Sequence, residues 1–200
     1  MSRRFGLSKE DGREGDADLL AAARHGNSEA FRSLVDRYQA VVASVVIGML
    51  GAGDDADDVG QETFIRFHGA LDRFRGEAEL GTYLRRIAMN LSLNALKRRR
   101  KFRLRLVSRD QSEEAVDEPP VQAYDAERTE RHHLVRAAVA RLNEKHRAVV
   151  VLRVLEERST SETADILRVP AGTVMSRLAR GLDELEALLA PYVLGEAHDD

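Results

Sequence analysis

This 200-residue chain contains no cysteine and no tryptophan, and it has only four prolines. The absence of cysteine excludes disulfide bonds and thiolate metal sites. Aromatic residues make up 5% of the chain, whereas apolar residues as a whole make up 43%. Few prolines, few aromatic residues and many aliphatic ones favour helices over a β-sandwich. The composition therefore predicts an all-α protein.

The chain also lacks a long uninterrupted apolar segment. The longest apolar run, residues 41–50, contains Ser44 and Gly48 and is far too short to span a bilayer. Residues 1–18 are polar and of mixed charge, without the apolar core of a signal peptide. We therefore expect a soluble cytoplasmic protein that does not insert into a membrane.

Neither sign of charge dominates, since 31 Lys and Arg residues face 34 Asp and Glu residues and the net charge is −3. A nucleic-acid-binding protein with this balance must concentrate its positive charge in patches. Residues 97–105 form such a patch, with seven Lys or Arg among nine residues. A solvated helix end is the alternative, because cations suit a helix C-terminus. The density of the run exceeds what capping needs and favours phosphate binding, which releases counterions.

Apolar periodicity and capping residues divide the chain into two helical blocks. We expect a disordered arm over residues 1–15, then a helical domain over 16–106. Within it, Asp16 is predicted to cap a helix over 17–25, and Thr82 a later helix that runs into the basic patch. Residues 107–130 are acidic, contain two consecutive prolines and show no sustained period, so they predict a flexible linker. A second helical domain is expected over 131–190, followed by a tail over 191–200 that begins where Pro191 ends the last helix.

The second block contains the pattern of a helix-turn-helix. Residues 159–162 (STSE) form a predicted capping box at the start of a short helix, and Pro170 suits the first position of the next helix. That next helix, to about residue 189, carries one apolar stripe: Val174, Leu178, Leu182, Leu185 and Leu189. Mostly small residues and arginines are left facing outward, which suits a DNA major groove: Ala171, Gly172, Met175, Ser176, Arg177 and Arg180. Two short helices that bind nothing are the alternative interpretation.

Before the basic patch, one predicted helix face combines arginine with asparagine: Arg85, Arg86, Met89, Asn90, Asn94 and Lys97. Arginine binds phosphate and asparagine can hydrogen-bond base edges, while Tyr83 could stack on an unpaired base. From the residues alone, an exposed polar face without a ligand is the stronger interpretation.

An acidic cluster, Asp54, Asp55, Asp57 and Asp58, precedes Gln61 and Glu62. Carboxylates can bind divalent cations, but the spacing does not match an EF-hand loop, and helix N-termini favour acidic residues in any case. An acidic helix face that docks on a basic partner is the preferred interpretation. The six histidines lack HExxH spacing, and no Gly-rich phosphate loop or GxSxG motif occurs. The sequence therefore supports no active site, no cofactor and no metal site.

Three segments, in order, resemble those of the extracytoplasmic-function (ECF) group of bacterial sigma factors, which direct RNA polymerase to promoters. Residues 55–64 (DADDVGQETF) are similar to the group's D-A-E-D-x-x-Q-E-T-F segment. Residues 74–76 (FRG) and 82–90 (TYLRRIAMN) are similar to its F-R-G and T-W-L-x-R-I-A-x-N segments, and residues 172–178 (GTVMSRL) to G-T-V-K-S-R-L. The resemblance covers residues 16–100 and 131–190, and implies two small helical domains, the second a helix-turn-helix.

The resemblance implies a promoter-specificity subunit without enzymatic activity. Its partners would be core RNA polymerase, contacted at the β′ clamp and the β flap, promoter DNA, and an anti-sigma protein. Polymerase binding is implied for Asp57, Asp58, Gln61 and Glu62. Contacts to the minus-ten element are implied for Tyr83, Arg86, Asn90, Asn94, Lys97 and Arg98. Contacts to the minus-thirty-five element are implied for Thr160, Ala171, Thr173, Ser176, Arg177 and Arg180.

Some residues depart from the group's pattern. Met175 stands where lysine or arginine is usual, Gly181 where another basic residue is common, and Tyr83 replaces a tryptophan. We expect the upstream DNA contact to carry less positive charge as a result. Two other functions stay open on the residues themselves. One is a stand-alone helix-turn-helix regulator whose N-terminal domain is a sensor or dimeriser, and a more distant one is a metal-dependent hydrolase that uses the acidic cluster.

Overall fold

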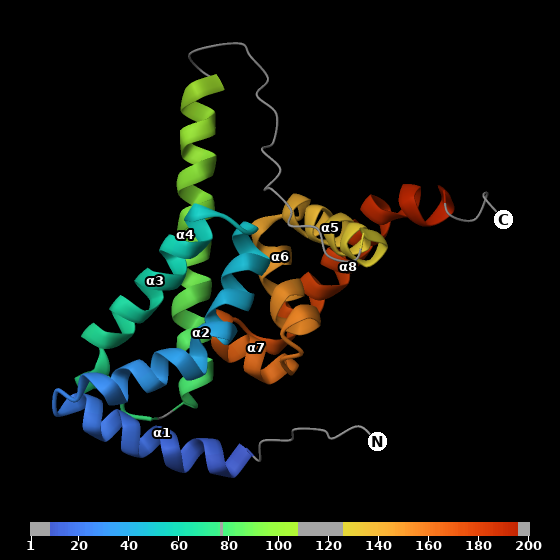
Figure 1. Ribbon diagram of the computed structural model, residues 1–200. Helices are drawn as coiled ribbons and strands as arrows, with labels where there is room; N and C mark the ends of the chain where they lie inside the picture. The colour runs from blue at the N-terminus through green and yellow to red at the C-terminus, as the bar shows by residue number, and fades with distance from the viewer. Residues whose placement is uncertain (1–8, 77, 108–125, 196–200) are drawn as a thin grey trace.

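The computed structural model describes residues 9–76, 78–107 and 126–195, and this part of the chain contains helices and no strand (Figure 1). The all-α prediction is therefore confirmed. The N-terminal module consists of α1 (Lys9–Arg24), α2 (Ser28–Leu50), α3 (Asp54–Gly69), the short 3-10 helix η1 (Leu71–Arg73) and α4 (Leu80–Val107). The C-terminal module consists of α5 (Ala126–Arg141), α6 (Glu144–Val150), the π-helical turn η2 (Val151–Leu155), α7 (Thr160–Leu167) and α8 (Ala171–Gly195).

Helix α2 is the central helix of the N-terminal module and packs against α1, α3 and α4. Its start is fixed by the side chain of Asn27, which accepts hydrogen bonds from the amides of Glu29 and Ala30. Its end is fixed by Gly51, whose φ of 80° suits glycine. By length and mean hydropathy alone α2 could cross a membrane. Its apolar face, which includes Leu34 and Val45, is instead buried in the core.

Helix α1 begins at Lys9, earlier than the predicted start after Asp16. Residues 9–15, expected in the N-terminal arm, are therefore helical. Asp16 lies inside the helix, is 7% exposed, and accepts hydrogen bonds from Arg37 and from the hydroxyl of Tyr38. It ties α1 to α2 instead of capping a helix. The remainder of the predicted arm (1–8), most of the predicted acidic linker (108–125) and the end of the tail (196–200) lie outside the described residues.

Helix α4 begins at Leu80, so Thr82 does not cap it, and it continues as a helix through the basic run. Its C-terminal end projects beyond the other helices (Figure 1). The predicted apolar face is buried at Leu84, Ala88, Leu91 and Ala95. Met89 was expected on the exposed face, yet it is fully buried. Helix α4 packs against α7 of the C-terminal module as well as against α2 and α3, and the apolar pattern of α4 alone does not reveal these contacts.

The C-terminal module is built on α6 and α8, which pack closely together. A Cβ atom at Gly181 would lie 2.9 Å from Val150 Cγ2, so only glycine allows this approach of α8 to α6. Two predictions for α8 are wrong. Leu182, assigned to the buried stripe, is 44% exposed, and Pro191 lies inside the helix, which continues to Gly195.

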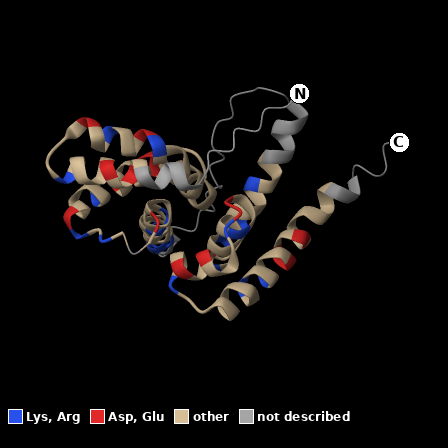
Figure 2. Ribbon diagram, turned by 90° about the horizontal axis from the view of Figure 1, so that it is seen from below, with Lys and Arg blue, Asp and Glu red and all other residues tan. Residues whose placement is uncertain are grey.

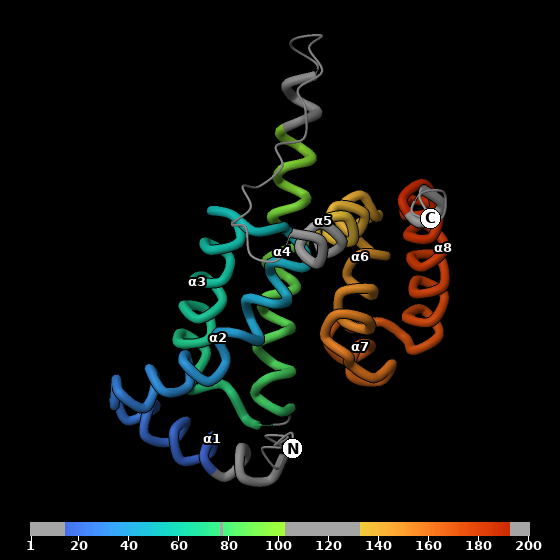
Figure 3. The backbone as a smooth tube through the Cα atoms, turned by 45° about the vertical axis from the view of Figure 1, so that its right-hand side comes forward, coloured from blue at the N-terminus to red at the C-terminus, as the bar shows by residue number. Residues whose placement is uncertain are grey.

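The two modules pack against each other, although we expected them to be joined by a tether alone. Figure 3 shows α1–α4 on one side and α6–α8 on the other. Their buried apolar side chains form one continuous cluster. The guanidinium of Arg147 donates a hydrogen bond to the backbone carbonyl of Met49 across the junction, at 2.8 Å. Gly48 faces the fully buried Val151, and a Cβ atom there would lie 2.9 Å from Val151 Cγ1.

Candidate nucleic-acid interface

The acidic residues of α3 lie along its outward side. Asp57, Asp58 and Gln61 are exposed, while Val59, Thr63 and Phe67 face the core. Glu62 is half-buried and pairs with Arg66 one turn later, at 2.7 Å. The structure therefore brings the four residues predicted to bind polymerase onto one face of a single helix. The face stays uncovered even though the modules pack together.

The same cluster does not resemble a metal site. Asp55 is paired with Arg99 of α4, at 2.5 Å. Within the described residues, no group of three or more His, Cys, Asp or Glu side chains is placed to hold a metal ion. The carboxylates of α3 are thus spread along a surface, as binding to an extended basic partner requires.

The basic part of α4 borders a pocket of about 370 Å³. It is lined by Arg66, Leu91, Asn94, Lys97, Arg98 and Lys101. Asn94, Lys97 and Arg98 come from the predicted minus-ten set, and all three are exposed. Asn90, also exposed, lies one turn before Asn94 on the same helix. Four cations and one side-chain amide line this pocket, a combination that suits phosphate with an unpaired base.

Sequence reasoning missed Arg66 in this pocket, and it assigned Lys101 to the basic patch 97–105 but not to the minus-ten set. Arg66 belongs to α3, one turn after Glu62, and nothing in the α4 pattern points to it. The heptad-like spacing of Asn94, Lys97 and Lys101 along α4 was a signal for Lys101. The approach of α3 to α4 is a tertiary contact that no local pattern encodes.

Tyr83 and Arg86 are placed differently from the rest of the predicted minus-ten set. The ring of Tyr83 packs in an aromatic cluster, with its centroid 4.9 Å from that of Phe74 and 6.3 Å from that of Phe67. Arg86 points to the C-terminal module, where its Nη2 donates a hydrogen bond to the carbonyl of Asp165 at 3.0 Å. Neighbouring Arg85 pairs with Glu156 at 3.0 Å. These two arginines therefore contact the C-terminal module.

The helix-turn-helix forms as predicted. Ser159 and Glu162 make the reciprocal hydrogen bonds of a capping box at the start of α7. Arg168 adopts the left-handed conformation, with φ of 53°, and ends α7. Pro170 immediately precedes α8 instead of occupying its first turn, and its carbonyl accepts hydrogen bonds from Thr173 and Val174.

The predicted minus-thirty-five residues gather at the start of α7 and along the outer side of α8. Ala171, Ser176 and Arg180 are exposed, whereas Thr160, Thr173 and Arg177 are half-buried. The hydroxyl of Ser176 donates to the carbonyl of Thr173, at 3.1 Å. Small exposed side chains at the start of α8, followed by Arg180, match the geometry of a helix that enters a major groove.

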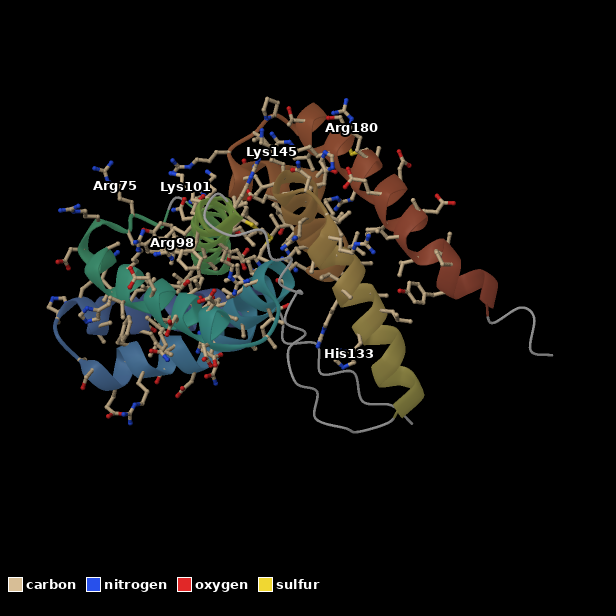
Figure 4. The ribbon with its side chains drawn as sticks, turned by 90° about the horizontal axis from the view of Figure 1, so that it is seen from above. Arg75, Arg98, Lys101, His133, Lys145 and Arg180 are labelled. Atoms are coloured by element: carbon tan, nitrogen blue, oxygen red, sulfur yellow. The ribbon has the colours of Figure 1, made fainter. Side chains whose placement is uncertain are left out.

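Positively and negatively charged residues are mixed in both modules. Lys and Arg are interspersed with Asp and Glu along the helices (Figure 2). Seen from above, however, Arg75, Arg98, Lys101, Lys145 and Arg180 lie on one side of the molecule, and His133 lies on the other (Figure 4). In this view, the labelled cations of both modules therefore lie toward the same edge of the molecule.

Comparison with known proteins adds independent information. A family model described as Sigma-70 region 2 matches residues 34–102, and one described as Sigma-70, region 4 matches residues 132–185. The chain is 31% identical to the ECF RNA polymerase sigma-E factor of Escherichia coli K12, over 89% of this chain and 96% of that protein. It is 28% identical to the ECF RNA polymerase sigma factor SigW of Bacillus subtilis, over 85% and 94%. Among solved structures it is similar to CnrH in complex with the cytosolic domain of CnrY, with a TM-score of 0.64, 28% identity, and coverage of 88% of this chain and 98% of that one.

Proposed function

The chain belongs to the extracytoplasmic-function group of RNA polymerase sigma factors and directs transcription initiation, and we propose how its surfaces divide that task. The acidic face of α3 binds core polymerase. The basic pocket between α3 and α4 binds the opened minus-ten element. The helix-turn-helix of α7 and α8 binds the minus-thirty-five element as duplex DNA.

The polymerase-binding surface consists of Asp57, Asp58, Gln61 and Glu62. Its single strongest support is that three of these side chains are exposed while both modules are folded and packed together. Their carboxylates complement a basic partner such as the β′ clamp, and the amide of Gln61 adds a directional hydrogen bond. The β flap is the second polymerase contact, and it binds the C-terminal module.

The minus-ten surface consists of Asn90, Asn94, Lys97 and Arg98, with Arg66 and Lys101 completing the pocket. Exposed cations around an amide support binding of single-stranded DNA, because the cations neutralise phosphates while the amide reads a base edge. Arg86 joins this surface when the C-terminal module moves away, since its guanidinium now contacts Asp165. Tyr83 supports the surface from within the aromatic cluster, beside Phe74.

The minus-thirty-five surface consists of Thr160, Ala171, Thr173, Ser176, Arg177 and Arg180. Its support is the capped helix-turn-helix geometry, with Arg180 on the same side of the molecule as Lys101 (Figure 4). An anti-sigma protein is the remaining partner, as CnrH is bound by the cytosolic domain of CnrY. The sigma factor acts in the cytoplasm, on polymerase and promoter DNA, and performs no chemistry of its own.

Alanine substitution of the α3 face tests the proposal. The triple variant Asp58→Ala, Gln61→Ala, Glu62→Ala is expected to bind core polymerase at least about tenfold more weakly, because charge complementarity and a hydrogen bond are lost together. Binding is measured by fluorescence anisotropy of labelled protein, and function by run-off transcription with core polymerase. Circular dichroism must show unchanged helicity.

The matched control removes the same groups from another surface. Asp18, Asp36 and Gln39 are exposed on α1 and α2, and replacing all three by alanine also removes two carboxylates and one amide. This control is expected to bind core polymerase normally. Normal binding by the α3 variant would refute the assignment. A tight, specific gel shift with promoter DNA in the absence of polymerase would favour the stand-alone regulator instead.

A further inference from the structure

The start of α8 presents an unusually apolar outward face for a surface that contacts DNA. Ala171, Gly172, Met175 and Ala179 are exposed, and Met175 is 54% exposed. Apart from its chain neighbours and the backbone of its own helix, nothing lies within 4 Å of the position that a Cβ of Gly172 would take. The hydroxyl of Ser176 on this face donates to the carbonyl of Thr173. The face therefore offers an open approach and one large flexible apolar side chain.

Met175 is held at the junction of the two helices. The hydroxyl of Thr160, in the first turn of α7, donates to Met175 Sδ at 3.6 Å. This contact orients the thioether across the α7–α8 junction while most of the side chain stays accessible. Arg180, the exposed cation on this part of α8, lies more than one turn further along the helix and suits a phosphate.

We propose that Met175 reads a thymine by apolar contact with its C5-methyl group in the upstream promoter element. The inference rests on the proposed binding of duplex DNA by α7 and α8. In the major groove the methyl group of thymine is the one apolar group that base pairs present. Methionine cannot donate the paired hydrogen bonds that identify guanine, but its polarizable thioether adapts to a methyl surface. The start of α8 therefore selects thymine where a basic side chain would select guanine.

Deoxyuridine tests this directly, since it differs from thymidine only by the missing methyl group. A promoter is first selected from a duplex library with the reconstituted holoenzyme, and each thymine of its upstream element is then replaced singly by deoxyuridine. At one position we expect the affinity of the wild-type holoenzyme to fall about fourfold, because burial of one methyl group contributes about that factor to binding. Met175→Ala is expected to weaken binding of the thymine promoter similarly and to remove the difference between thymine and uracil.

Two further variants sharpen the test. Leu182→Ala shortens another exposed apolar side chain of α8, and should retain full sensitivity to deoxyuridine. Met175→Lys is expected to shift the preference at that position from thymine to guanine. The inference is overturned if no deoxyuridine substitution weakens wild-type binding, or if Met175→Ala keeps the sensitivity.

The outcomes also separate this inference from the proposed function. If the library yields no upstream element at all, duplex reading by α7 and α8 fails and the inference fails with it. If an element is selected but uracil and thymine bind equally, only the role of Met175 is wrong. If Met175→Ala weakens holoenzyme assembly instead, equally for every DNA, then the exposed methionine is a protein-docking residue and the inference is also overturned.

Discussion

Asp16 links α1 to α2 through hydrogen bonds that offset the cost of burying its carboxylate. Its carboxylate accepts hydrogen bonds from Arg37 and from the hydroxyl of Tyr38, and is 7% exposed. Burial, together with the hydrogen bond and the negative charge of Asp16, raises the pKa of Tyr38 above the ordinary tyrosine value of 10.0. Tyr38 therefore keeps its proton longer in the folded state than in the unfolded state.

This pKa shift predicts a stability change at alkaline pH. A raised folded-state pKa means that the native protein binds more protons above pH 10.0, so the stabilisation by Tyr38 is complete below that pH and is lost as pH rises. Tyr38→Phe should destabilise the protein by about 1 kcal/mol near neutral pH, because one hydrogen bond is lost and Asp16 loses a donor. The difference in stability between wild type and variant should shrink above pH 10.0.

Urea denaturation of both proteins near neutral pH and above pH 10.0 measures this difference. Tyr192→Phe, at a residue that is 52% exposed, is the control and should leave stability near neutral pH unchanged. A constant difference between wild type and Tyr38→Phe across the alkaline range would contradict the assignment of the Asp16 interaction.

Single residues also show where sequence reasoning stops. Ser159 and Glu162 were predicted to form a capping box and do form one, because capping depends on residues within one turn. The side chains of Asn27 and Asn143 cap helices in the same local way. Asp16 has the same chemistry but bonds to another helix. A carboxylate near a helix start can satisfy amides or a tertiary partner, and only the fold decides between them.

At the scale of elements, the order and type of the helices could be predicted, whereas several ends could not. Periodicity and capping residues identified the two helical blocks and the helix-turn-helix. They did not reveal that α4 buries Met89 on its polar side, because such burial depends on tertiary contacts that periodicity does not encode. The same limit applies to the predicted site residues. Residues on a single helix face, such as those of α3, could be predicted together, but Arg66 enters the pocket from a neighbouring helix.

The exposed end of α4 predicts a salt effect. Arg98 and Lys101 are exposed and border the pocket, whereas Arg99 is engaged with Asp55. Arg98→Ala with Lys101→Ala should therefore make promoter binding by the holoenzyme less sensitive to salt. The slope of log affinity against log salt should fall by about 0.7 for each lost contact with single-stranded phosphate.

Titration of holoenzyme binding over a range of potassium concentrations gives this slope. The control, Arg32→Ala with Arg73→Ala, removes two exposed cations from α2 and η1, and is expected to leave the slope unchanged. An equal fall in both variants would indicate a general charge effect and not phosphate contacts at the end of α4.

For the whole molecule, the packing of the two modules decides which surfaces are free. The Arg85–Glu156 pair at their junction is largely buried, with side chains 11% and 7% exposed. Arg147 of α6 is also buried, and desolvation lowers the pKa of its guanidinium. Its hydrogen bonds to the carbonyls of Met49 and Leu142 compensate for burial of the charge. The closed arrangement leaves the α3 face open but engages Arg86.

Gly48 offers a way to open this arrangement without touching a charged group. Alanine has a higher helix propensity than glycine, so Gly48→Ala by itself should stabilise helix α2 by about 1 kcal/mol. The new methyl group would nevertheless lie 2.9 Å from Val151 Cγ1, and Val151 is fully buried and stiff. We therefore expect the modules to move apart, and the hydrogen bond from Arg86 to Asp165 to break. Because the chain has no cysteine, labels at Arg32→Cys and Asp183→Cys report the separation by energy transfer.

The energy-transfer distance is expected to increase in Gly48→Ala and to stay constant in Gly60→Ala, where a Cβ atom meets nothing within 4 Å.

The same comparison tests the assignment of Arg86. In the closed arrangement its guanidinium is held by Asp165, so it can contact the minus-ten strand only after the modules separate. If Gly48→Ala opens the molecule, the free chain should bind a minus-ten oligonucleotide more tightly, and Arg86→Ala should remove that gain. An unchanged distance in Gly48→Ala would mean that the junction adapts around Val151. A larger distance with no gain in binding would mean that Arg86 serves the module contact alone.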